Sequence, residues 1–208
     1  MMNYSLSLLL GFTFLINSCE PLSTTKIIRL GHGLNTSHSV HKAMVYMGEQ
    51  LEIKSNGKIK LQIYPSQQLG TERQCLELLQ IGALDMTKSS AGVLENFSPG
   101  MKVLGLPYLF RNREHSFKVL DGPIGKELLA GAEKYWLKGL AYYDAGSRSF
   151  YTINTPVKQP SDLEGLKIRV QESQTAIDMV KSFGGSPTPI SHGELLSLIH
   201  ISEPTRPL

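Results

Sequence analysis

Two arginines carry the chemistry that is easiest to state from the sequence. Arg148 lies in the polar stretch Asp144–Ser149, and Arg169 lies on the polar face of a short strand expected at 165–170. A guanidinium is a planar fork that fits a carboxylate with two parallel hydrogen bonds, so both arginines are candidates to bind an organic acid. The alternative for each is a solvated surface charge, and spacing alone does not decide between the two interpretations.

Three histidines lie close together in the sequence, namely His32, His38 and His41. His38 and His41 would share one face of a helix, which could bring two ligands to a zinc ion. A zinc site needs three or four ligands held by further hydrogen bonds, and no fourth ligand at a diagnostic spacing is found nearby. The alternative is that these histidines line a cleft or face solvent, and we predict no metal.

A pair of glycines surrounds His32. Gly31 and Gly33 follow an expected strand and precede an expected helix, as in a phosphate-binding loop. Thr36 stands where a dinucleotide fingerprint has its third glycine, and no acidic residue ends a later strand at the expected distance. The sequence also lacks the motifs of serine hydrolases, zinc peptidases and phosphate-loop enzymes, and no two carboxylates form a recognisable catalytic pair. We therefore expect neither an enzyme nor a cofactor.

The N-terminus carries an apolar run, Leu6–Ile16, followed by Asn17, Ser18 and Cys19. The run has the length of the apolar part of a signal peptide and is shorter than the roughly 20 residues that span a bilayer. A small residue before a cysteine resembles a lipoprotein cleavage site. Residues 1–18 are therefore predicted to be a signal peptide of the lipoprotein type, with Cys19 lipidated. No Lys or Arg precedes the run, so a plain secretory signal or a buried segment are the alternatives.

Composition narrows the class of protein further. The 208 residues are 41% hydrophobic and 19% charged, which is typical of a globular protein and argues against disorder and against many membrane spans. The net charge of +3 and the absence of long Lys/Arg clusters argue against nucleic-acid binding. The second cysteine, Cys75, lies among leucines and is predicted to be a small core residue rather than a nucleophile.

The elements that must position these residues alternate between strand and helix. Hydrophobic periodicity predicts strands at 26–31, 58–65 and 85–89, with helices at 39–55 and 71–81 between them. This order is typical of an α/β protein with a parallel sheet and right-handed crossovers.

The second part of the chain predicts further elements. Helices are expected at 114–120, 125–135 and 174–183, strands at 137–143, 149–154 and 165–170, and a helix start at the capping box formed by Ser191 and Glu194. Residues 198–208, LIHISEPTRPL, contain two prolines and no periodicity, and we interpret them as a non-native tail that replaces the natural sequence.

Three separated blocks resemble the solute-binding subunits of TRAP transporters, the DctP family. They are SQQLGTERQCLELLQIGALDMTK at 66–88, VLGLPYLFR at 103–111 and SDLEGLKIRVQESQTAIDMVKSFGGSPTPI at 161–190. The resemblance implies an exported, periplasmic, non-enzymatic receptor with a two-lobed α/β fold of the periplasmic-binding-protein type, with parallel or mixed sheets flanked by helices. It also implies a first lobe at 26–147, a partial second lobe at 148–197 and a missing C-terminal part.

The resemblance further implies a ligand site. Arg169, in the GLKIRV segment, would make the principal salt bridge to a ligand carboxylate, Arg148 would assist, and Glu72, Ser90 and His32 would line the cleft. The ligand would be a sugar acid, a uronate or a dicarboxylate. A sugar acid is favoured because Glu72 would repel a second ligand carboxylate but accept hydroxyl donors.

The expected partners are the two TRAP permease subunits and the membrane that holds the lipid anchor, and the receptor is expected to be a monomer. Two other functions stay open at this point. One is a lipid-anchored, metal-dependent enzyme that uses His32, His38 and His41, and the other is a sensor module with the same two-lobed fold.

Overall fold

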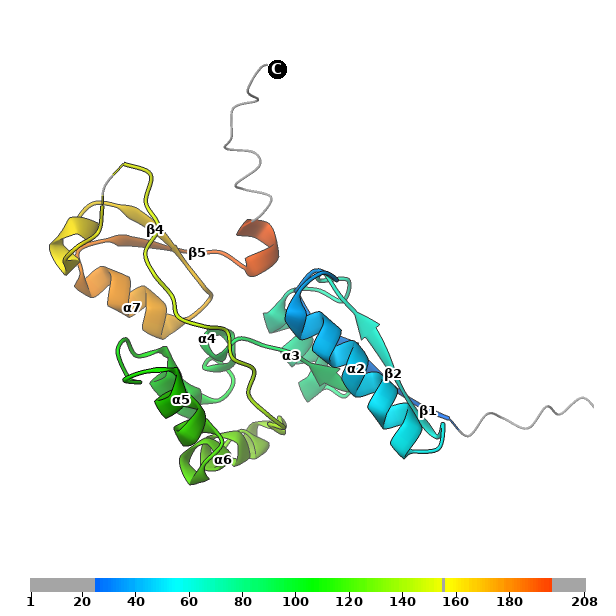
Figure 1. Ribbon diagram of the computed structural model, residues 1–208. Helices are drawn as coiled ribbons and strands as arrows, with labels where there is room; N and C mark the ends of the chain where they lie inside the picture. Colours follow the sequence, from blue (N-terminus) through cyan, green and yellow to red (C-terminus); the bar gives the residue numbers. More distant parts are fainter. Residues whose placement is uncertain (1–24, 155, 196–208) are drawn as a thin grey trace, which may run out of the picture.

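Two parallel sheets organise the chain (Figure 1). The computed structural model describes residues 25–154 and 156–195. The first sheet has the strand order β2-β1-β3, and the second pairs β4 with β5. The elements are β1 (Lys26–Gly31), α2 (Ser39–Lys54), β2 (Ile59–Tyr64), α3 (Glu72–Gln80), β3 (Met86–Thr87), α4 (Ala91–Leu94), η2 (Pro99–Gly105), α5 (Arg113–Leu120), α6 (Pro123–Ala130), η3 (Glu133–Tyr135), η4 (Pro160–Leu163), β4 (Lys167–Val170), α7 (Gln174–Ser182) and β5 (Ser186–Pro189).

The first sheet confirms the β-α-β-α-β order predicted from the sequence. Lys26 lies opposite Ile59 in β2, and Leu30 lies opposite Met86 in β3, with all strands parallel. Helix α3 begins at a capping box, in which Thr71 and Gln74 each satisfy a backbone N–H of the other. The third strand is shorter than predicted, because only Met86 and Thr87 pair with β1.

Cys75 is confirmed as a small core residue. It is buried on α3 against the end of β1, where a Cβ on Gly31 would lie 3.2 Å from the Cys75 sulfur. Glycine at this position therefore lets the helix approach the strand closely. Burial raises the pKa of the Cys75 thiol, so the reactive thiolate is disfavoured.

The second sheet is built from β4, α7 and β5, and β5 contains two prolines. The backbone N–H groups of Ser186 and Ile190 donate to Leu166 and Val170, on the side that faces β4. Pro187 and Pro189 alternate with these donors, so their missing N–H groups fall on the side away from β4. Proline is tolerated in such an edge strand.

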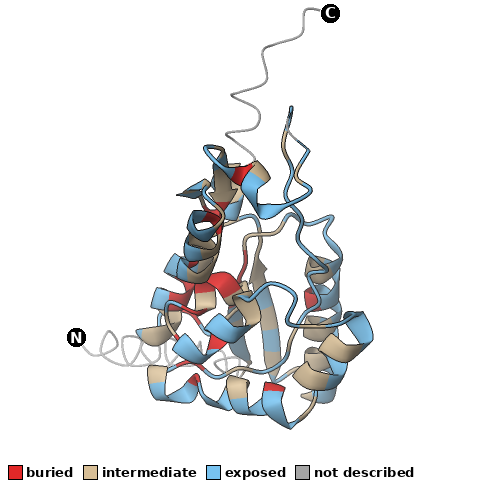
Figure 2. Ribbon diagram, turned by 90° about the vertical axis from the view of Figure 1, so that its left-hand side faces the viewer, coloured by how far each residue is buried: buried red, intermediate tan, exposed pale blue. Residues whose placement is uncertain are grey.

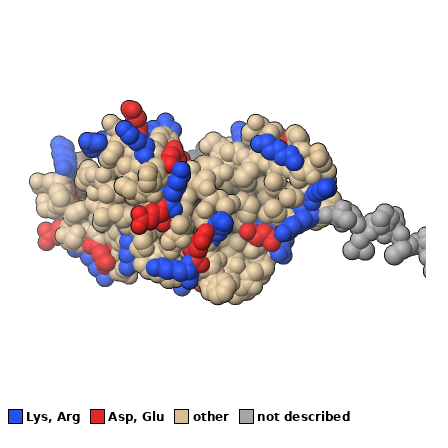
Figure 3. Space-filling view, turned by 90° about the horizontal axis from the view of Figure 1, so that it is seen from below, with Lys and Arg blue, Asp and Glu red and all other residues tan. Residues whose placement is uncertain are grey.

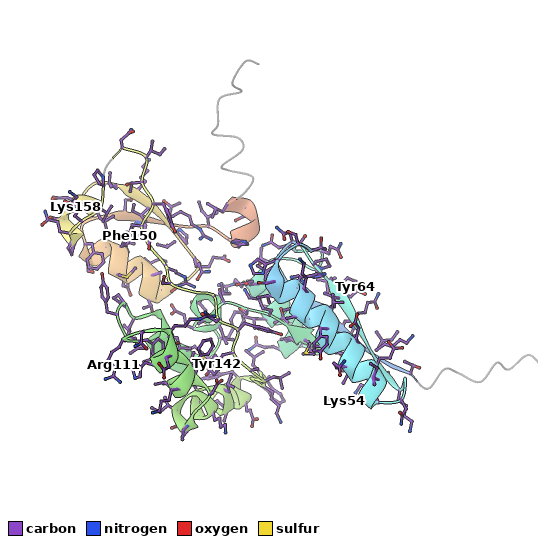
Figure 4. The ribbon with its side chains drawn as sticks, in the orientation of Figure 1. Lys54, Tyr64, Arg111, Tyr142, Phe150 and Lys158 are labelled. Carbon is purple, nitrogen blue, oxygen red and sulfur yellow. The ribbon has the colours of Figure 1, made fainter. Side chains whose placement is uncertain are left out.

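The strands predicted at 137–143 and 149–154 are not present. The chain there runs as an extended segment from α6 toward β4, with no strand pairing (Figure 1). A strand needs the hydrogen bonds of a neighbouring strand, and Tyr151 and Ile153 are instead 90% and 97% exposed. One anchor of the segment is the Tyr142 hydroxyl, which donates to the Gly125 carbonyl in α6 at 2.8 Å (Figure 4).

The surface carries mixed charge, and the buried residues gather in the middle of the molecule (Figure 2). On the face seen in Figure 3, basic and acidic side chains are interspersed rather than collected into a patch of one sign. No helix within residues 25–154 and 156–195 is long and apolar enough to cross a membrane.

A buried carboxylate joins the α4 region to the second sheet unit. Glu95, just after α4, is 0% exposed, and its Oε1 accepts hydrogen bonds from the Ser173 hydroxyl at 2.9 Å and from the Thr175 N–H at 2.8 Å. The neighbouring Asn96 donates its amide to the Glu172 carbonyl at 2.7 Å. These bonds fix the turn between β4 and α7, and the carboxylate lies at the N-terminus of α7, where helix amides favour negative charge.

We expect Glu95→Ala to lower the free energy of unfolding by about 3 kcal/mol, because it leaves two buried donors without an acceptor. Glu95→Gln should cost only about 1 kcal/mol, since the amide oxygen can accept both bonds. Urea denaturation followed by circular dichroism measures both values. Glu49→Ala, on the exposed side of α2, is the matched control, and equal stability of Glu95→Ala and the wild type would contradict the role given to Glu95.

Candidate functional site

Arg169 lies in the wall of a small cavity between the two sheet units. Its half-buried guanidinium donates from Nε and Nη2 to the Ile190 carbonyl oxygen, at 3.0 and 2.6 Å. The enclosed volume is about 10 Å³, which is near the room that one water molecule needs. The residues that line this Arg169 cavity are Gln67, Glu72, Val93, Arg169, Gln171, Glu172, Ile190, Ser191 and His192.

The cavity lies where parallel strands end. Gln67 follows β2, Gln171 follows β4, and Ser191 follows β5. Ligands of open α/β sheets bind at the carboxyl ends of the strands, because the loops there converge on one edge. The predicted capping box is confirmed beside the cavity: Ser191 Oγ accepts from the Glu194 N–H at 3.4 Å, and the Glu194 carboxylate accepts from the Ser191 N–H at 3.3 Å.

Arg148 and Arg169 are close enough for their charges to repel. Burial lowers the pKa of Arg169, and repulsion from Arg148 lowers it further, while Glu172 and Glu72 act in the opposite direction. Arg148 itself is exposed and lies in the extended segment before β4. Two guanidinium groups near one partly desolvated cavity favour an anion, because an anion relieves their repulsion and supplies acceptors.

Glu72 and Ser90 are brought together with a third residue, Lys88. The Lys88 ammonium donates to Glu72 Oε1 at 2.8 Å, and Ser90 donates to Oε2 from its N–H at 3.0 Å and its hydroxyl at 2.7 Å. Burial alone would raise the pKa of Glu72, but the Lys88 charge and the bonds from Lys88 and Ser90 hold it below its ordinary value. Glu72 is therefore ionised, with its charge balanced by Lys88.

The three histidines have separate structural roles. The Leu34 N–H donates to His32 Nδ1 at 3.1 Å, so the remaining proton of neutral His32 is on Nε2, which lies 3.0 Å from His41 Nδ1. His38 caps α2 by accepting the Val40 N–H at its Nδ1. Within residues 25–154 and 156–195, no group of three or more His, Cys, Asp or Glu side chains could hold a metal ion.

His32 is buried at the end of β1 and does not line the Arg169 cavity. Of the residues predicted for the site, Arg169 and Glu72 line the cavity. Ser90 does not line it but donates a hydrogen bond to Glu72, and Arg148 does not line it but repels the charge of Arg169. Sequence reasoning missed Gln67, Gln171 and His192, although each follows a strand end and that position was available as a signal.

The sequence matches a family model at residues 30–200, described as bacterial extracellular solute-binding protein, family 7, DctP. The protein YiiZ of Salmonella typhimurium is 41% identical over 170 residues, which are 81% of this chain and 52% of YiiZ. The chain thus spans about half the length of the curated relatives that it matches.

Solved structures share the fold. A TRAP periplasmic solute-binding protein of Xanthobacter autotrophicus with bound β-D-galacturonate superposes with a TM-score of 0.79 and 40% identity, covering 84% of this chain and 58% of that one. A Bradyrhizobium protein in complex with D-galacturonate gives 0.78 and 42% over the same shares. A Sulfurospirillum deleyianum protein with bound succinate gives 0.79 and 25%, over 85% and 57%. The likeness confirms the predicted periplasmic-binding-protein-like α/β fold.

The pH dependence of stability should report His32. Burial, with the His41 ring and the Lys88 charge, lowers the pKa of His32 from 6.5 to about 4. Between these values the folded chain binds fewer protons than the unfolded chain. The free energy of unfolding is therefore highest above pH 6.5 and decreases as the pH is lowered toward 4, by about 3 kcal/mol in total.

Thermal melts from pH 7.5 to 4 measure this loss. We expect His32→Asn to flatten the profile in that window, since asparagine does not titrate. His38→Asn is the matched control, because it removes an exposed histidine and retains a side chain that caps helices well. A wild-type profile that is already flat between pH 6.5 and 4 would refute the depressed pKa of His32.

Proposed function

The chain belongs to family 7 of the bacterial extracellular solute-binding proteins, the DctP family, and from this premise we propose that it captures a small organic acid anion for delivery to a TRAP permease. Members of this family bind solutes, so the prediction of a non-enzymatic protein is confirmed at the level of the family. The observation that carries the proposal is that Arg169 lines a cavity at the ends of parallel strands and is close enough to Arg148 for the two positive charges to repel.

Arg169 already makes the contact that a carboxylate would make. One carbonyl oxygen of Ile190 accepts from both Nε and Nη2 of the guanidinium. A carboxylate would offer two oxygens and a full negative charge to the same fork, and charge-assisted hydrogen bonds are about twice as strong as neutral ones. The ligand anion therefore competes favourably with Ile190 for Arg169.

The cavity must open before it can admit an acid of this size, because its present volume suits a single water molecule. We infer a first lobe at 26–147 and part of a second lobe at 148–197. Gln67 and Glu72 would then line the cavity from the first lobe, and Arg169 from the second. Closure of two such walls around an anion would exclude water and strengthen the charge pairing.

The choice between a sugar acid or uronate and a dicarboxylate does not rest on Glu72. The Lys88 ammonium pairs with Glu72 at 2.8 Å and balances its charge, so the repulsion of a second ligand carboxylate is weakened. The Glu72 carboxylate has about four acceptor positions, and three are occupied by Lys88 and Ser90. Glu72 can therefore accept about one further hydroxyl.

Export and anchoring complete the proposal. The relatives of known structure are periplasmic proteins, and residues 1–18 and Cys19 lie outside the described residues. A lipid on Cys19 would hold the receptor at the membrane, near the permease.

We expect Cys19→Ser to move the chain from the membrane fraction to the soluble periplasmic fraction, as followed by immunoblotting. Unchanged membrane association of Cys19→Ser would contradict the anchor and leave ligand capture untouched.

The binding role of Arg169 can be tested by calorimetry with D-galacturonate. We expect Arg169→Ala to weaken binding by roughly a hundredfold, because two charge-assisted hydrogen bonds are lost. Arg169→Lys should recover only part of this loss, since an ammonium is a point charge that cannot form the two-pronged contact.

Arg73→Ala is the matched control, because Arg73 is an exposed arginine paired with Glu77 on the surface of α3. It should bind as the wild type does. If Arg169→Ala binds D-galacturonate as tightly as the wild type, Arg169 is not the residue that binds the ligand carboxylate.

A further inference from the structure

Two unpaired polar atoms belong to the wall of the Arg169 cavity. Among the described residues, three buried side-chain atoms have no hydrogen-bond partner, namely Gln67 Nε2, Gln171 Oε1 and Glu95 Oε2. The side chains of Gln67 and Gln171 both line this cavity. A buried donor or acceptor without a partner costs about 1–3 kcal/mol, and native proteins retain few of them. A water molecule in the closed cavity or a polar group of the ligand would supply the missing partner, and a ligand that displaces the water must replace its hydrogen bonds.

Gln67 is held in place by a strained backbone. Ser66 and Gln67 have φ values of +53° and +61°, in the left-handed region that residues other than glycine adopt at a cost. Their N–H groups donate to the carbonyls of Leu34 and His32, which fixes the turn against the end of β1. The Gln67 amide contacts the position that a Cβ on Gly193 would occupy, so the side chain reaches from β2 across to the end of β5.

Gln171 is held by the opposite wall. It lies two residues after Arg169, so the alternation of side chains along an extended chain directs both toward the same face. Its Oε1 lies beside α4, where a Cβ on Gly92 would be 2.9 Å away. The hydrogen bonds of Glu95 and Asn96 to residues 172–175 fix the turn that Gln171 begins.

We propose that Gln67 and Gln171 form a subsite that recognises hydroxyl groups of the ligand while Arg169 holds its carboxylate. This subsite rests on the proposed function. Gln67 donates an amide hydrogen to a ligand oxygen, and Gln171 accepts a hydrogen from a ligand hydroxyl. A hydroxyl can do both, whereas an ionised carboxylate can only accept.

The chemical class of the ligand follows from this pairing. A plain dicarboxylate such as succinate would place its second anionic group beside the Gln171 oxygen, where it has no hydrogen to give. A monocarboxylate that carries several hydroxyl groups satisfies both amides. Sites built to bond a hydroxyl discriminate strongly against a ligand that lacks it, because the buried polar groups of the site are left unpaired.

Methionine substitutions at the two positions test the subsite, because methionine matches the shape of glutamine without its polar atoms. We expect Gln67→Met and Gln171→Met each to weaken D-galacturonate binding about tenfold, the effect of one lost hydrogen bond. The melting temperature without ligand should stay constant or rise, since an unpaired buried polar group has been removed. If the two glutamines had only a structural role, the methionine variants would show both a lower affinity for D-galacturonate and a lower melting temperature without ligand.

Gln68→Met is the matched control, because Gln68 is the exposed neighbour of Gln67. It should change neither affinity nor melting temperature. Calorimetry with succinate completes the set: the wild type should bind it at least tenfold more weakly than D-galacturonate.

The outcomes separate the two proposals. If the wild type binds neither acid, the proposed function fails and the subsite fails with it. If the wild type binds D-galacturonate and both methionine variants bind it equally well, only the subsite is wrong. Equal affinity of the wild type for succinate and D-galacturonate would also refute the subsite and leave the organic-acid receptor standing.

Discussion

The contact of Glu95 with the start of α7 is the constraint on which the ligand site depends. Glu95 is fully buried, and its Oε1 accepts two hydrogen bonds from the start of α7 while its Oε2 has no hydrogen-bond partner. It lies just after α4, where the dipole of that short helix disfavours negative charge, but at the N-terminus of α7, where the longer helix favours it. The second sheet unit is therefore held against α4 in one orientation, and the position of the wall with Arg169 and Gln171 follows from it.

Local patterns predicted the first sheet well because its determinants are local. The apolar stripe of α2, the alternation in β2 and the Thr71 capping box each act within a few residues. The strands expected at 137–143 and 149–154 are absent, because alternation does not supply a neighbouring strand. Strand β5 escaped prediction for the opposite reason: Pro187 and Pro189 are typical of turns, yet both are tolerated where the strand lies at a sheet edge.

The charged residues of the site could be predicted from the sequence, but its neutral polar residues could not. Arg169 was expected on the polar face of a strand, and the family resemblance singled out its carboxylate chemistry. The balance of Glu72 by Lys88 depends on a contact across 16 residues that no spacing rule describes. The strand-end position of Gln67 was visible in the sequence, but its direction toward the cavity was not. Two consecutive left-handed residues without glycine set that direction, and they are held by the carbonyls of His32 and Leu34, which follow another strand.

Capture of the carboxylate and recognition of hydroxyl groups are joined by one segment, residues 190–193. The Ile190 carbonyl occupies the Arg169 fork, and Gly193 contacts the Gln67 amide. An anion that takes the Nε and Nη2 edge of Arg169 would displace the Ile190 carbonyl, and Gly193, three residues further along the same segment, lies against the Gln67 amide. Because a ligand shifts a conformational equilibrium only by its preference for one state, an acid with hydroxyl groups would have two contacts that favour the displaced state, one at Arg169 and one at Gln67. A simple carboxylate gains only the first of these, so the same movement that admits the anion favours the hydroxylated ligand.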